Sequence, residues 1–149
     1  MKVISGKYKT LLLIKPRAWE NYGYRIVRVI QKKGFHVAET REVKMDEKDA
    51  REFYAEHEGK NFYPTLVEYM TSGLILAVKI VSDDENLIKN LRNFVGNTDP
   101  AKAEEGTLRR MYGCPELYEQ GQPTNAIHAS DSQESASREL PFFFPEQYY

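Results

Sequence analysis

The stretch that decides the fold runs from Leu74 to Val81 and has the sequence LILAVKIV. It is the most apolar stretch of the chain, and its length and composition are typical of a buried strand. We therefore expect it to be a central strand of a sheet. A second apolar run, from Tyr8 to Lys15, contains LLLI and ends at Pro16. This pattern predicts another strand, covered on both of its faces.

Between the two runs, hydrophobic spacing predicts three helices and one weaker strand. They are a helix from Trp19 to Lys33 that stops at Gly34, a strand from Phe35 to Lys44, a helix capped by Asp46, and a short helix that stops near Gly73. The helix after Asp46 is expected to have an apolar face with i, i+3, i+4, i+7 spacing, formed by Ala50, Phe53, Tyr54 and His57.

After the central strand, Asp83 and Asp84 open a predicted helix whose apolar stripe ends before Gly96. That stripe consists of Leu87, Leu91, Phe94 and Val95. Residues 97–124 show little periodicity and predict a long loop, which a compact domain rarely contains unless the loop is functional. A last strand is expected from Asn125 to His128.

The C-terminal part is expected to be a helix followed by an aromatic tail. The helix runs from Ser132 to Leu140, with Ser130 and Gln133 placed for a capping box. Residues 141–149 contain several aromatic side chains, and we expect them to pack on the surface of this or a neighbouring subunit.

The order of elements is therefore β-α-β-(α-α)-β-α-β-α. It predicts an α+β, ferredoxin-like βαββαβ fold, with a four-stranded antiparallel sheet, helices on one face and added surface helices. We expect one domain over residues 1–149, with an N-terminal tail at 1–7 and a C-terminal tail at 141–149.

The composition limits the class of protein. The chain has 149 residues, of which 41% are hydrophobic and 29% charged, as in an ordinary globular protein. The net charge of −1 argues against a general polyanion binder. No apolar run is long enough to span a bilayer, and Met1–Lys7 is too short and polar for a secretory signal, so we expect a cytoplasmic protein. The single cysteine, Cys114, excludes an internal disulfide and a cysteine-rich metal site.

The segment from Asn125 to Ser132, with the sequence NAIHASDS, places a histidine at a strand-to-helix junction. Backbone N–H groups and the positive end of a helix dipole make such a junction suitable for phosphate. A lone histidine beside an apolar run is nevertheless more often structural, so other segments must decide. The common phosphate-binding loops G-x-x-x-x-G-K-[ST] and G-x-G-x-x-G do not occur in the sequence. Paired-histidine zinc spacing does not occur either, because His36, His57 and His128 are far apart.

Cationic, hydroxyl and aromatic residues at the ends of elements are the remaining candidates. They are Lys15, Tyr54, Phe62, Arg92, Thr98, Arg109 and, after His128, Glu139. Each has a simpler structural explanation when it is taken alone. Tyr54 can pack on its helix, Arg92 can extend beside an apolar stripe, and Glu139 can be a solvated helix carboxylate.

The segment 125–132 resembles the signature N-x-x-H-[GA]-S-D of nucleoside diphosphate kinases. Other pieces of that family's pattern occur in the family's order, and the match covers about residues 9 to 145. They are KP at 15–16, FYP at 62–64, LV at 66–67, YM at 69–70, GNTDP at 96–100 and GTLR at 106–109. The resemblance implies transfer of the γ-phosphoryl group from a nucleoside triphosphate to a nucleoside diphosphate through a phosphohistidine, a ping-pong reaction.

The resemblance also implies a role for each matching residue. His128 would be the nucleophile, and Glu139 would hold its other ring nitrogen. The positions that contact phosphates or the ribose are matched by Lys15, Tyr54, Arg92, Thr98, Arg109 and Asn125, of which Lys15 and Tyr54 join the catalytic set. Phe62 matches the aromatic residue on which the base stacks, and stacking tolerates any base.

The implied partners are nucleotides, Mg²⁺ and further copies of the chain. ATP, ADP, GTP, GDP and other nucleotides would be substrates. Magnesium would arrive bridging their phosphates, since the sequence has no dense set of carboxylates to hold it. Family resemblance further implies a homo-oligomer, either a hexamer or a tetramer.

Two segments depart from the family's pattern. Lys15-Pro16-Arg17 stands where the family has K-P-D, and the following residues 18–24 lack the usual R-G-L and are one residue short. The extra cation either alters phosphate affinity or supports a different subunit contact. Residues 111–124 contain an insertion before the histidine motif, at the place where the family contacts the nucleotide base.

Two other classes of function compete with an active kinase. A catalytically weak or inactive relative would serve as a nucleotide-binding or interaction scaffold, but it would be expected to have lost His128, Lys15 or Arg109. A nucleic-acid-binding module can stack bases on a four-stranded sheet. The chain lacks the aromatic pattern and the basic charge balance of such a module.

Overall fold

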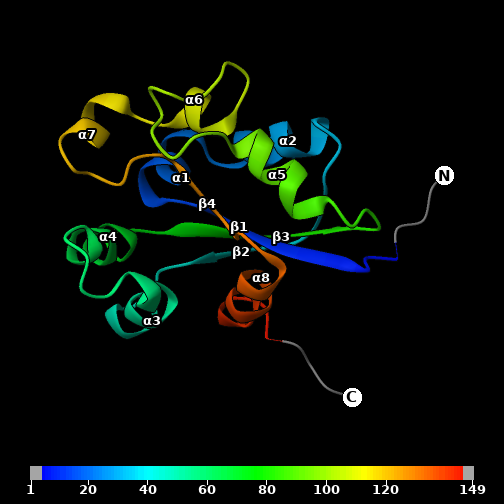
Figure 1. The fold of residues 1–149 in the computed structure, drawn as a ribbon, viewed down its shortest axis with the longest axis horizontal. Helices are drawn as coiled ribbons and strands as arrows, with labels where there is room; N and C mark the ends of the chain where they lie inside the picture. Colours follow the sequence, from blue (N-terminus) through cyan, green and yellow to red (C-terminus); the bar gives the residue numbers. More distant parts are fainter. Residues whose placement is uncertain (1–4, 146–149) are drawn as a thin grey trace.

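In the computed structural model, which describes residues 5–145, four strands form one antiparallel sheet (Figure 1). They are β1 (Tyr8–Ile14), β2 (His36–Val43), β3 (Ile75–Ser82) and β4 (Ile127–Ala129). The order across the sheet is β2-β3-β1-β4, so the two most apolar stretches form the central strands, as predicted. β1 pairs with β3 along its whole length and with β4 near its C-terminal end.

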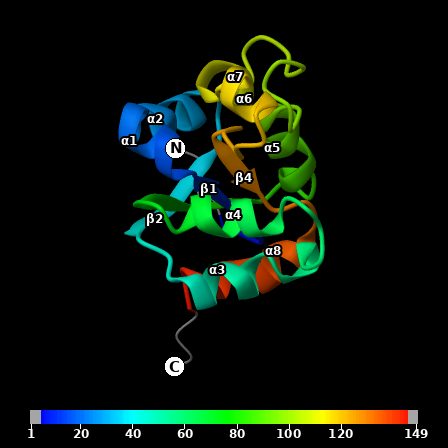
Figure 2. The ribbon, with the colours of Figure 1, turned by 90° about the vertical axis from the view of Figure 1, so that its left-hand side faces the viewer.

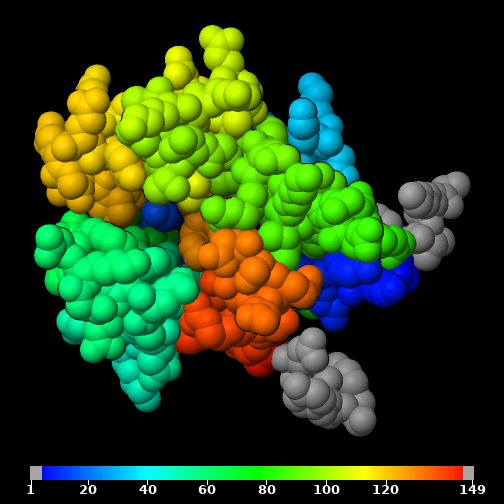
Figure 3. Space-filling model, viewed as in Figure 1, coloured from blue at the N-terminus to red at the C-terminus, as the bar shows by residue number. Residues whose placement is uncertain are grey.

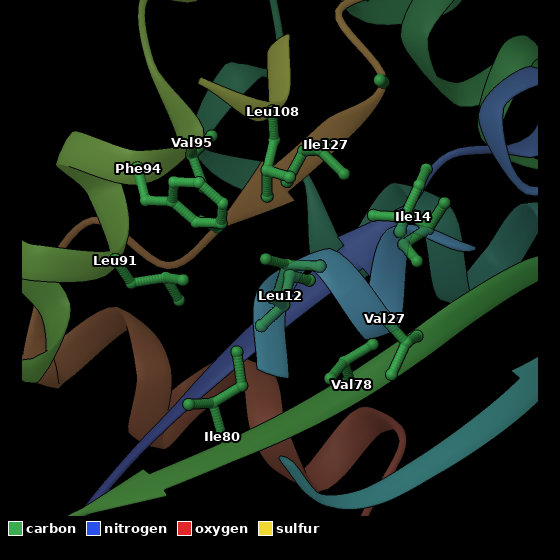
Figure 4. Packing of buried hydrophobic residues seen from close by; sticks show 14 of the residues in the cluster. Leu12, Ile14, Val27, Val78, Ile80, Leu91, Phe94, Val95, Leu108 and Ile127 are labelled. Carbon is green, nitrogen blue, oxygen red and sulfur yellow. The ribbon is translucent and has the colours of Figure 1, made fainter. Parts of the chain in front are cut away.

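Both faces of the central strands are buried, because successive side chains alternate between two hydrophobic clusters. From β1, Leu12 and Ile14 belong to the first cluster, and Leu11 and Leu13 belong to the second. All four side chains are fully buried. Figure 4 shows the first cluster, where side chains of the sheet meet those of the helices above it.

The face of the first cluster carries α1 (Pro16–Tyr22), α2 (Tyr24–Lys32) and α5 (Leu87–Val95). The single helix predicted from Trp19 to Lys33 is wrong, because the chain breaks at Gly23, where φ is 53°. Glycine adopts this conformation at little cost, so the helix ends there although the apolar spacing continues into α2. The predicted stripe of α5 is buried, but that helix begins at Leu87 and not at the two aspartates.

The opposite face carries α3 (Glu47–Phe53), the 3₁₀ turns η1 (Ala55–His57) and η2 (Leu140–Phe142), α4 (Tyr63–Met70) and α8 (Gln133–Glu139). Asp46 caps α3 as predicted, since its carboxylate accepts the N–H of Asp49 at 2.7 Å. α3 is shorter than predicted. It ends at Phe53, so His57 lies on η1 and not on the helix.

The C-terminal segment packs on the same chain. Phe143 and Phe144 are buried in the second cluster, while residues 146–149 of the predicted aromatic tail lie outside the described part. Ser132 caps α8 by accepting the N–H of Ser135 at 3.0 Å. The predicted capping box with Ser130 is therefore wrong, and the Ser130 hydroxyl has a different partner, described below.

Residues 97–124 are not a continuous loop, contrary to the prediction. They contain α6 (Leu108–Tyr112) and α7 (Pro115–Glu119), each of five residues, which is too short for a hydrophobic period to be visible. Two hydrogen bonds join Cys114 to Thr124, one between backbone N–H and carbonyl at 2.8 Å and one from the threonine hydroxyl at 2.9 Å. They close residues 114–124, which we call the α7 segment.

The architecture is the predicted ferredoxin-like fold. α2 and α5, which follow β1 and β3 in the chain, lie on one face of the sheet, and α3, α4 and α8 are added on the other (Figure 1). No helix within residues 5–145 is long and apolar enough to cross a membrane.

Candidate active site

A cavity of about 560 Å³ opens beside β4, between the α7 segment and the part of the chain that contains α3 and α4. Figure 3 shows the hollow between yellow-orange and teal-green atoms, with blue atoms of the N-terminal part at its bottom. Its lining includes every residue predicted for the site: Lys15, Tyr54, Phe62, Arg92, Thr98, Arg109, Asn125, His128 and Glu139. The fold therefore brings the whole predicted set together.

The imidazole of His128 is held from one side by a buried carboxylate. Its Nε2 lies 2.7 Å from Oε1 of Glu139, which is only 2% exposed. The hydroxyl of Ser130 donates to the same oxygen at 2.8 Å. A carboxylate accepts hydrogen bonds, so Nε2 carries the proton and Nδ1 is left with a free lone pair.

The glutamate and the histidine ring have further supports. The guanidinium of Arg138 donates to Oε2 of Glu139 at 3.4 Å and to the carbonyl of Phe53 at 3.2 Å. Phe53 and Tyr54 lie edge-on to the His128 ring, with centroids at 5.1 and 5.8 Å. These contacts restrict the imidazole to one orientation, which favours reaction at a fixed place.

Three cations line the cavity without a carboxylate partner. Within residues 5–145, no ion pair involves Lys15, Arg92 or Arg109. Arg92 donates to the carbonyl of Ala129 at 2.9 Å, which places its guanidinium next to β4. An uncompensated cluster of positive charge in a partly buried cavity is a site for an anion such as phosphate.

Arg109 is buried and fixed by backbone carbonyls. Its Nη2 and Nε donate to Ile127 at 2.9 and 3.3 Å, and its Nη1 donates to Gly96 at 3.0 Å. Burial, followed by the nearby charge of Arg92, lowers its pKa to about 10. Gly96 has a φ of 92°, and a Cβ there would lie 2.6 Å from Oγ1 of Thr107, which caps α6. The end of α5 is thereby packed closely against the start of the helix that carries Arg109.

Lys15 is 5% exposed and points at the segment before β4. Its Nζ donates to Oδ1 of Asn125 at 2.6 Å and lies 3.5 Å from the carbonyl of Pro123. Burial and then the charge of Arg109 lower its pKa to about 7. The amide of Asn125 also donates to the carbonyl of Thr98 at 3.1 Å, which ties the loop after α5 to the cavity.

The backbone turns sharply between Asn125 and β4. Ala126 has a φ of 69°, a conformation that costs a residue with a Cβ about 1–2 kcal/mol. The turn separates Asn125, whose side chain faces Lys15, from Ile127, which is fully buried in the core. Strain is thus located two residues before the candidate nucleophile.

Tyr54 and Phe62 give the cavity two different aromatic groups. The hydroxyl of Tyr54 is buried and has no hydrogen-bond partner among the described residues. Its pKa is raised, mainly by burial and then by the charge of Glu139. Phe62 is 49% exposed, with the ring of His57 at 5.1 Å and the ammonium of Lys60 5.7 Å from its centroid. One is a free donor inside the cavity, and the other is a flat apolar surface at its mouth.

Several residues of the site were not predicted. Ser130 and Arg138 act on Glu139, and His57, Tyr118, Gln122 and Pro123 line the cavity. Ser130 lies inside the NAIHASDS segment, which was a usable signal. Tyr118, Gln122 and Pro123 belong to the insertion. The position of the insertion near the base was expected, but its contacts could not be derived from spacing.

Comparison with known proteins identifies the family. The family model described as nucleoside diphosphate kinase matches residues 8–149. The chain belongs to the nucleoside diphosphate kinase family. It is 42% identical over 137 residues to the nucleoside diphosphate kinase of Persephonella marina, covering 91% of this chain and 92% of that one. It is 38% identical over 141 residues to that of Methanocaldococcus jannaschii, covering 94% and 95%.

Solved structures of nucleoside diphosphate kinases have the same fold. The enzyme from Aquifex aeolicus superposes with a TM-score of 0.78 at 34% identity, over 91% of this chain and 93% of that one. The enzyme from Encephalitozoon cuniculi superposes with a TM-score of 0.81 at 27% identity, over 93% and 90%. These structural neighbours support the ferredoxin-like assignment made above.

Arg17, where this nucleoside diphosphate kinase departs from the K-P-D pattern, lies away from the cavity. It lines a separate hollow with Trp19 and Glu20, and its backbone N–H donates to the hydroxyl of Tyr69 at 3.1 Å. Since Arg17 does not line the cavity that contains His128, it does not add a fourth cation to Lys15, Arg92 and Arg109.

Proposed function

We propose that this chain is an active nucleoside diphosphate kinase in which His128 carries the phosphoryl group between two nucleotides. The observation that carries the proposal is the meeting, in one cavity, of an imidazole held by a buried carboxylate and three cations without carboxylate partners. The imidazole is a nucleophile, and the three cations form a site for several phosphates. The nucleoside diphosphate kinase family supports this class of reaction.

The reaction has two half-reactions that share one covalent intermediate. In the first, the lone pair of Nδ1 of His128 attacks the γ-phosphorus of a nucleoside triphosphate. The bond from that phosphorus to the β,γ-bridging oxygen breaks, and the diphosphate leaves with the electron pair. In the second, a terminal oxygen of an acceptor diphosphate attacks the phosphorus and the N–P bond breaks. Nδ1 already has a lone pair, so no general base is needed.

Glu139 is a positioning residue in this proposal. Its carboxylate accepts the Nε2–H throughout both half-reactions, which fixes the tautomer of His128. When Nδ1 becomes bonded to phosphorus, the ring acquires positive charge, and the adjacent carboxylate stabilises that charge. Ser130 and Arg138 keep the carboxylate in place.

The remaining polar residues bind the nucleotide. Lys15, Arg92 and Arg109 neutralise phosphate oxygens, and they also offset the charge that spreads over the transferring group in the transition state. The free hydroxyl of Tyr54 is a donor for that group. Thr98 and Asn125 lie beside the cations and contribute donors to the phosphates or the ribose.

Phe62 explains a lack of base selectivity. A base stacked on an exposed aromatic ring gains roughly 1–3 kcal/mol, whichever base it is. The substrates are accordingly purine and pyrimidine nucleotides, such as ATP, ADP, GTP and GDP.

Mg²⁺ is part of the substrate in this proposal. Within residues 5–145, no group of three or more His, Cys, Asp or Glu side chains could hold a metal ion. Magnesium that keeps several waters and is bound through phosphate oxygens matches the preference of this ion. It offsets part of the charge of the phosphates while the three cations offset the rest.

Assembly and location stay predictions. The edge strand β2 has mostly exposed residues, and Tyr24 on α2 is 54% exposed, which favours burial by further copies of the chain in a hexamer or a tetramer. Sedimentation equilibrium measures the number of copies. Cytoplasmic location rests on the sequence alone, in which a single cysteine favours a reducing compartment.

The decisive experiment is the intact mass of the protein after brief incubation with Mg-ATP. We expect one acid-labile phosphoryl group that adding a nucleoside diphosphate removes. His128→Ala should remain unmodified while still binding ADP. A phosphorylated His128→Ala variant would contradict the assignment of the nucleophile. Nucleotide binding without phosphorylation of the wild type would favour the scaffold function.

A further inference from the structure

Arg138, the residue directly before Glu139, does not line the cavity that contains His128. Its side chain is partly exposed, and its guanidinium has contacts on two helices. Nη2 lies 3.4 Å from Oε2 of Glu139 on α8, and Nη1 donates at 3.2 Å to the carbonyl of Phe53, the last residue of α3. Figure 2 shows both helices on the same face of the sheet, and the side chain of Arg138 joins them.

The contacts of Arg138 complete a closed path around His128. The path starts at the imidazole, whose Nε2 lies 2.7 Å from Oε1 of Glu139. It continues from the other carboxylate oxygen to Arg138, and from there to the carbonyl of Phe53. It closes through the ring of Phe53, which lies edge-on to the imidazole with centroids 5.1 Å apart. In a closed path each member is held from two sides, so none can turn without weakening two contacts.

The carboxylate of Glu139 needs Arg138 because its other contacts share one oxygen. His128 and Ser130 both act on Oε1. The contact to Oε2 within residues 5–145 comes from Arg138. The terminal torsion of a glutamate side chain is only weakly restrained, so a carboxylate held at one oxygen can turn about its Cγ–Cδ bond. Arg138 removes this freedom by holding the second oxygen.

The second contact of Arg138 holds the end of α3. The last carbonyls of a helix have no partner within the helix, and a cationic donor satisfies them and interacts favourably with the helix dipole. Tyr54 follows Phe53 directly, and its hydroxyl is buried without a hydrogen-bond partner among the described residues. Arg138 thus holds the peptide group that joins Phe53 to Tyr54, and with it the base of the Tyr54 side chain.

We infer that Arg138 is a positioning residue for phosphoryl transfer, which holds Glu139 and Tyr54 in fixed positions relative to His128. This inference rests on the proposed function, since it assigns Arg138 an effect on the phosphorylation of His128. Glu139 acts on the far nitrogen of the imidazole, and Tyr54 is the donor for the transferring group. Arg138 acts only through these two residues. The rate of phosphorylation therefore depends on Arg138, whereas the affinity for ADP, which lacks the transferring group, does not.

The test measures two quantities in each variant: the single-turnover rate of phosphorylation by saturating Mg-ATP, and the affinity for Mg-ADP by titration calorimetry. Arg138→Met removes both contacts, and we expect the rate to fall about fivefold, the rate equivalent of one ordinary hydrogen bond. The affinity for Mg-ADP should not change, which also shows that the variant is folded. Arg138→Lys keeps the charge but lacks the planar fork that reaches both acceptors, so it should recover only part of the rate.

Two further variants complete the test. Arg51→Met is the matched control, because Arg51 is an exposed arginine on α3 that pairs with Glu47 and does not line the cavity. A double-mutant cycle combines Arg138→Met with Glu139→Gln. Residues of one network are not additive, so the double variant should lose less than the product of the two single losses.

The outcomes separate this inference from the proposed function. An unchanged rate in Arg138→Met, an equal loss in Arg51→Met, or a fall in ADP affinity as large as the fall in rate would overturn the inference. Full recovery in Arg138→Lys, or losses that multiply in the double variant, would also overturn it, because Arg138 would then not act by bridging to Glu139. Phosphorylation of the wild type and its absence in His128→Ala report on the proposed function, and neither depends on Arg138.

Discussion

In the proposed mechanism, His128 gains its reactivity from the group that holds its second nitrogen. Glu139 is almost completely buried and accepts from both His128 and Ser130. A carboxylate in that position has few water contacts, so its charge acts on the imidazole with little screening. By the proposed mechanism, the transition state requires the negative charge of Glu139 as well as its hydrogen bond.

The first prediction concerns that charge. Glu139→Gln keeps an acceptor for Nε2–H but removes the charge, and we expect phosphorylation of His128 to slow by about tenfold, the difference between a charged and a neutral hydrogen bond. Single-turnover phosphorylation by Mg-ATP measures the rate. Glu134→Gln is the control, because Glu134 is exposed on the same helix. An unchanged rate in Glu139→Gln would contradict the role of the charge.

The second prediction concerns Lys15. Its pKa of about 7 means that about half of the free protein has a neutral Lys15 at that pH. Phosphate favours the ammonium, so ADP binding should take up a proton, and affinity should decrease from about pH 7 towards about pH 9. Titration calorimetry at several pH values, in two buffers of different ionisation enthalpy, measures the proton uptake and the affinity. Lys15→Arg keeps its charge over this range and should show a flat profile. A flat profile in the wild type would count against this prediction.

The lowered pKa of Lys15 also makes the stability of the folded protein depend on pH. The pKa of Lys15 in the folded protein lies below its ordinary value of 10.5, so the unfolded chain binds more protons between about pH 7 and that value. The contribution of this residue to stability therefore rises with pH across the window. Below about pH 7, the folded protein bears the full cost of a buried ammonium.

The sequence predicts the contact residues of the site better than their supports. All nine candidates line one cavity, because each belongs to a motif that is recognisable without the fold. Arg138 is different. It acts on Glu139 and on the carbonyl of Phe53, and the second contact joins residues that are 85 positions apart. No local pattern reports such a contact.

At the scale of elements, the close packing of α5 on α6 decides where Arg109 lies. The carbonyl of Gly96 accepts from Arg109, and the missing side chain of Gly96 leaves room for Thr107. Gly96 thus ends α5 and also allows the start of α6 to pack closely against it.

The third prediction tests this packing. Gly96→Ala should destabilise the protein by about 1–3 kcal/mol or more, because its Cβ would clash with Thr107 in addition to the strain of a positive φ. ADP affinity should fall as well, since Arg109 would shift. Gly34→Ala is the control, because Gly34 also has a positive φ but nothing within 4 Å of its Cβ position. Chemical denaturation measures both variants. Equal losses of stability in Gly96→Ala and Gly34→Ala would show that the positive φ, and not the clash with Thr107, causes the effect.

The strands were easier to predict than the helix boundaries. The two central strands, β1 and β3, span seven and eight residues and are built on apolar runs, a length that favours a buried strand over a helix. The break at Gly23 was missed because the spacing of Tyr22, Ile26 and Ile30 is maintained across it. The cap of α8 was missed because Ser130 and Ser132 are both good capping residues, and only the fold assigns Ser130 to Glu139.

At the scale of the whole molecule, the fold holds three cations together without a carboxylate near enough to pair with any of them in the described chain. Keeping these charges close costs folding free energy. By the proposed function, a bound polyphosphate would offset this cost, so the stability of the fold would depend on whether nucleotide is bound.

The fourth prediction follows from this link. Mg-ADP at about a hundred times its Kd should stabilise the protein by about 2.7 kcal/mol. The stabilisation is measured as an increase in Tm, and this increase should become smaller as salt is added. Arg92→Met should show a smaller Tm shift at the same nucleotide concentration. Lys89→Met is the control, since Lys89 is an exposed cation on the same helix. The prediction fails if both variants respond to nucleotide equally.

The closure of the α7 segment has a practical consequence. The backbone groups of Cys114 hold the base of that segment, which leaves its thiol outside the pair of hydrogen bonds. Cys114 is also the single cysteine of the chain. A thiol-reactive fluorophore would therefore label one defined place, where the α7 segment joins the rest of the protein. Its emission would report in real time whether this segment moves as a nucleotide enters and leaves.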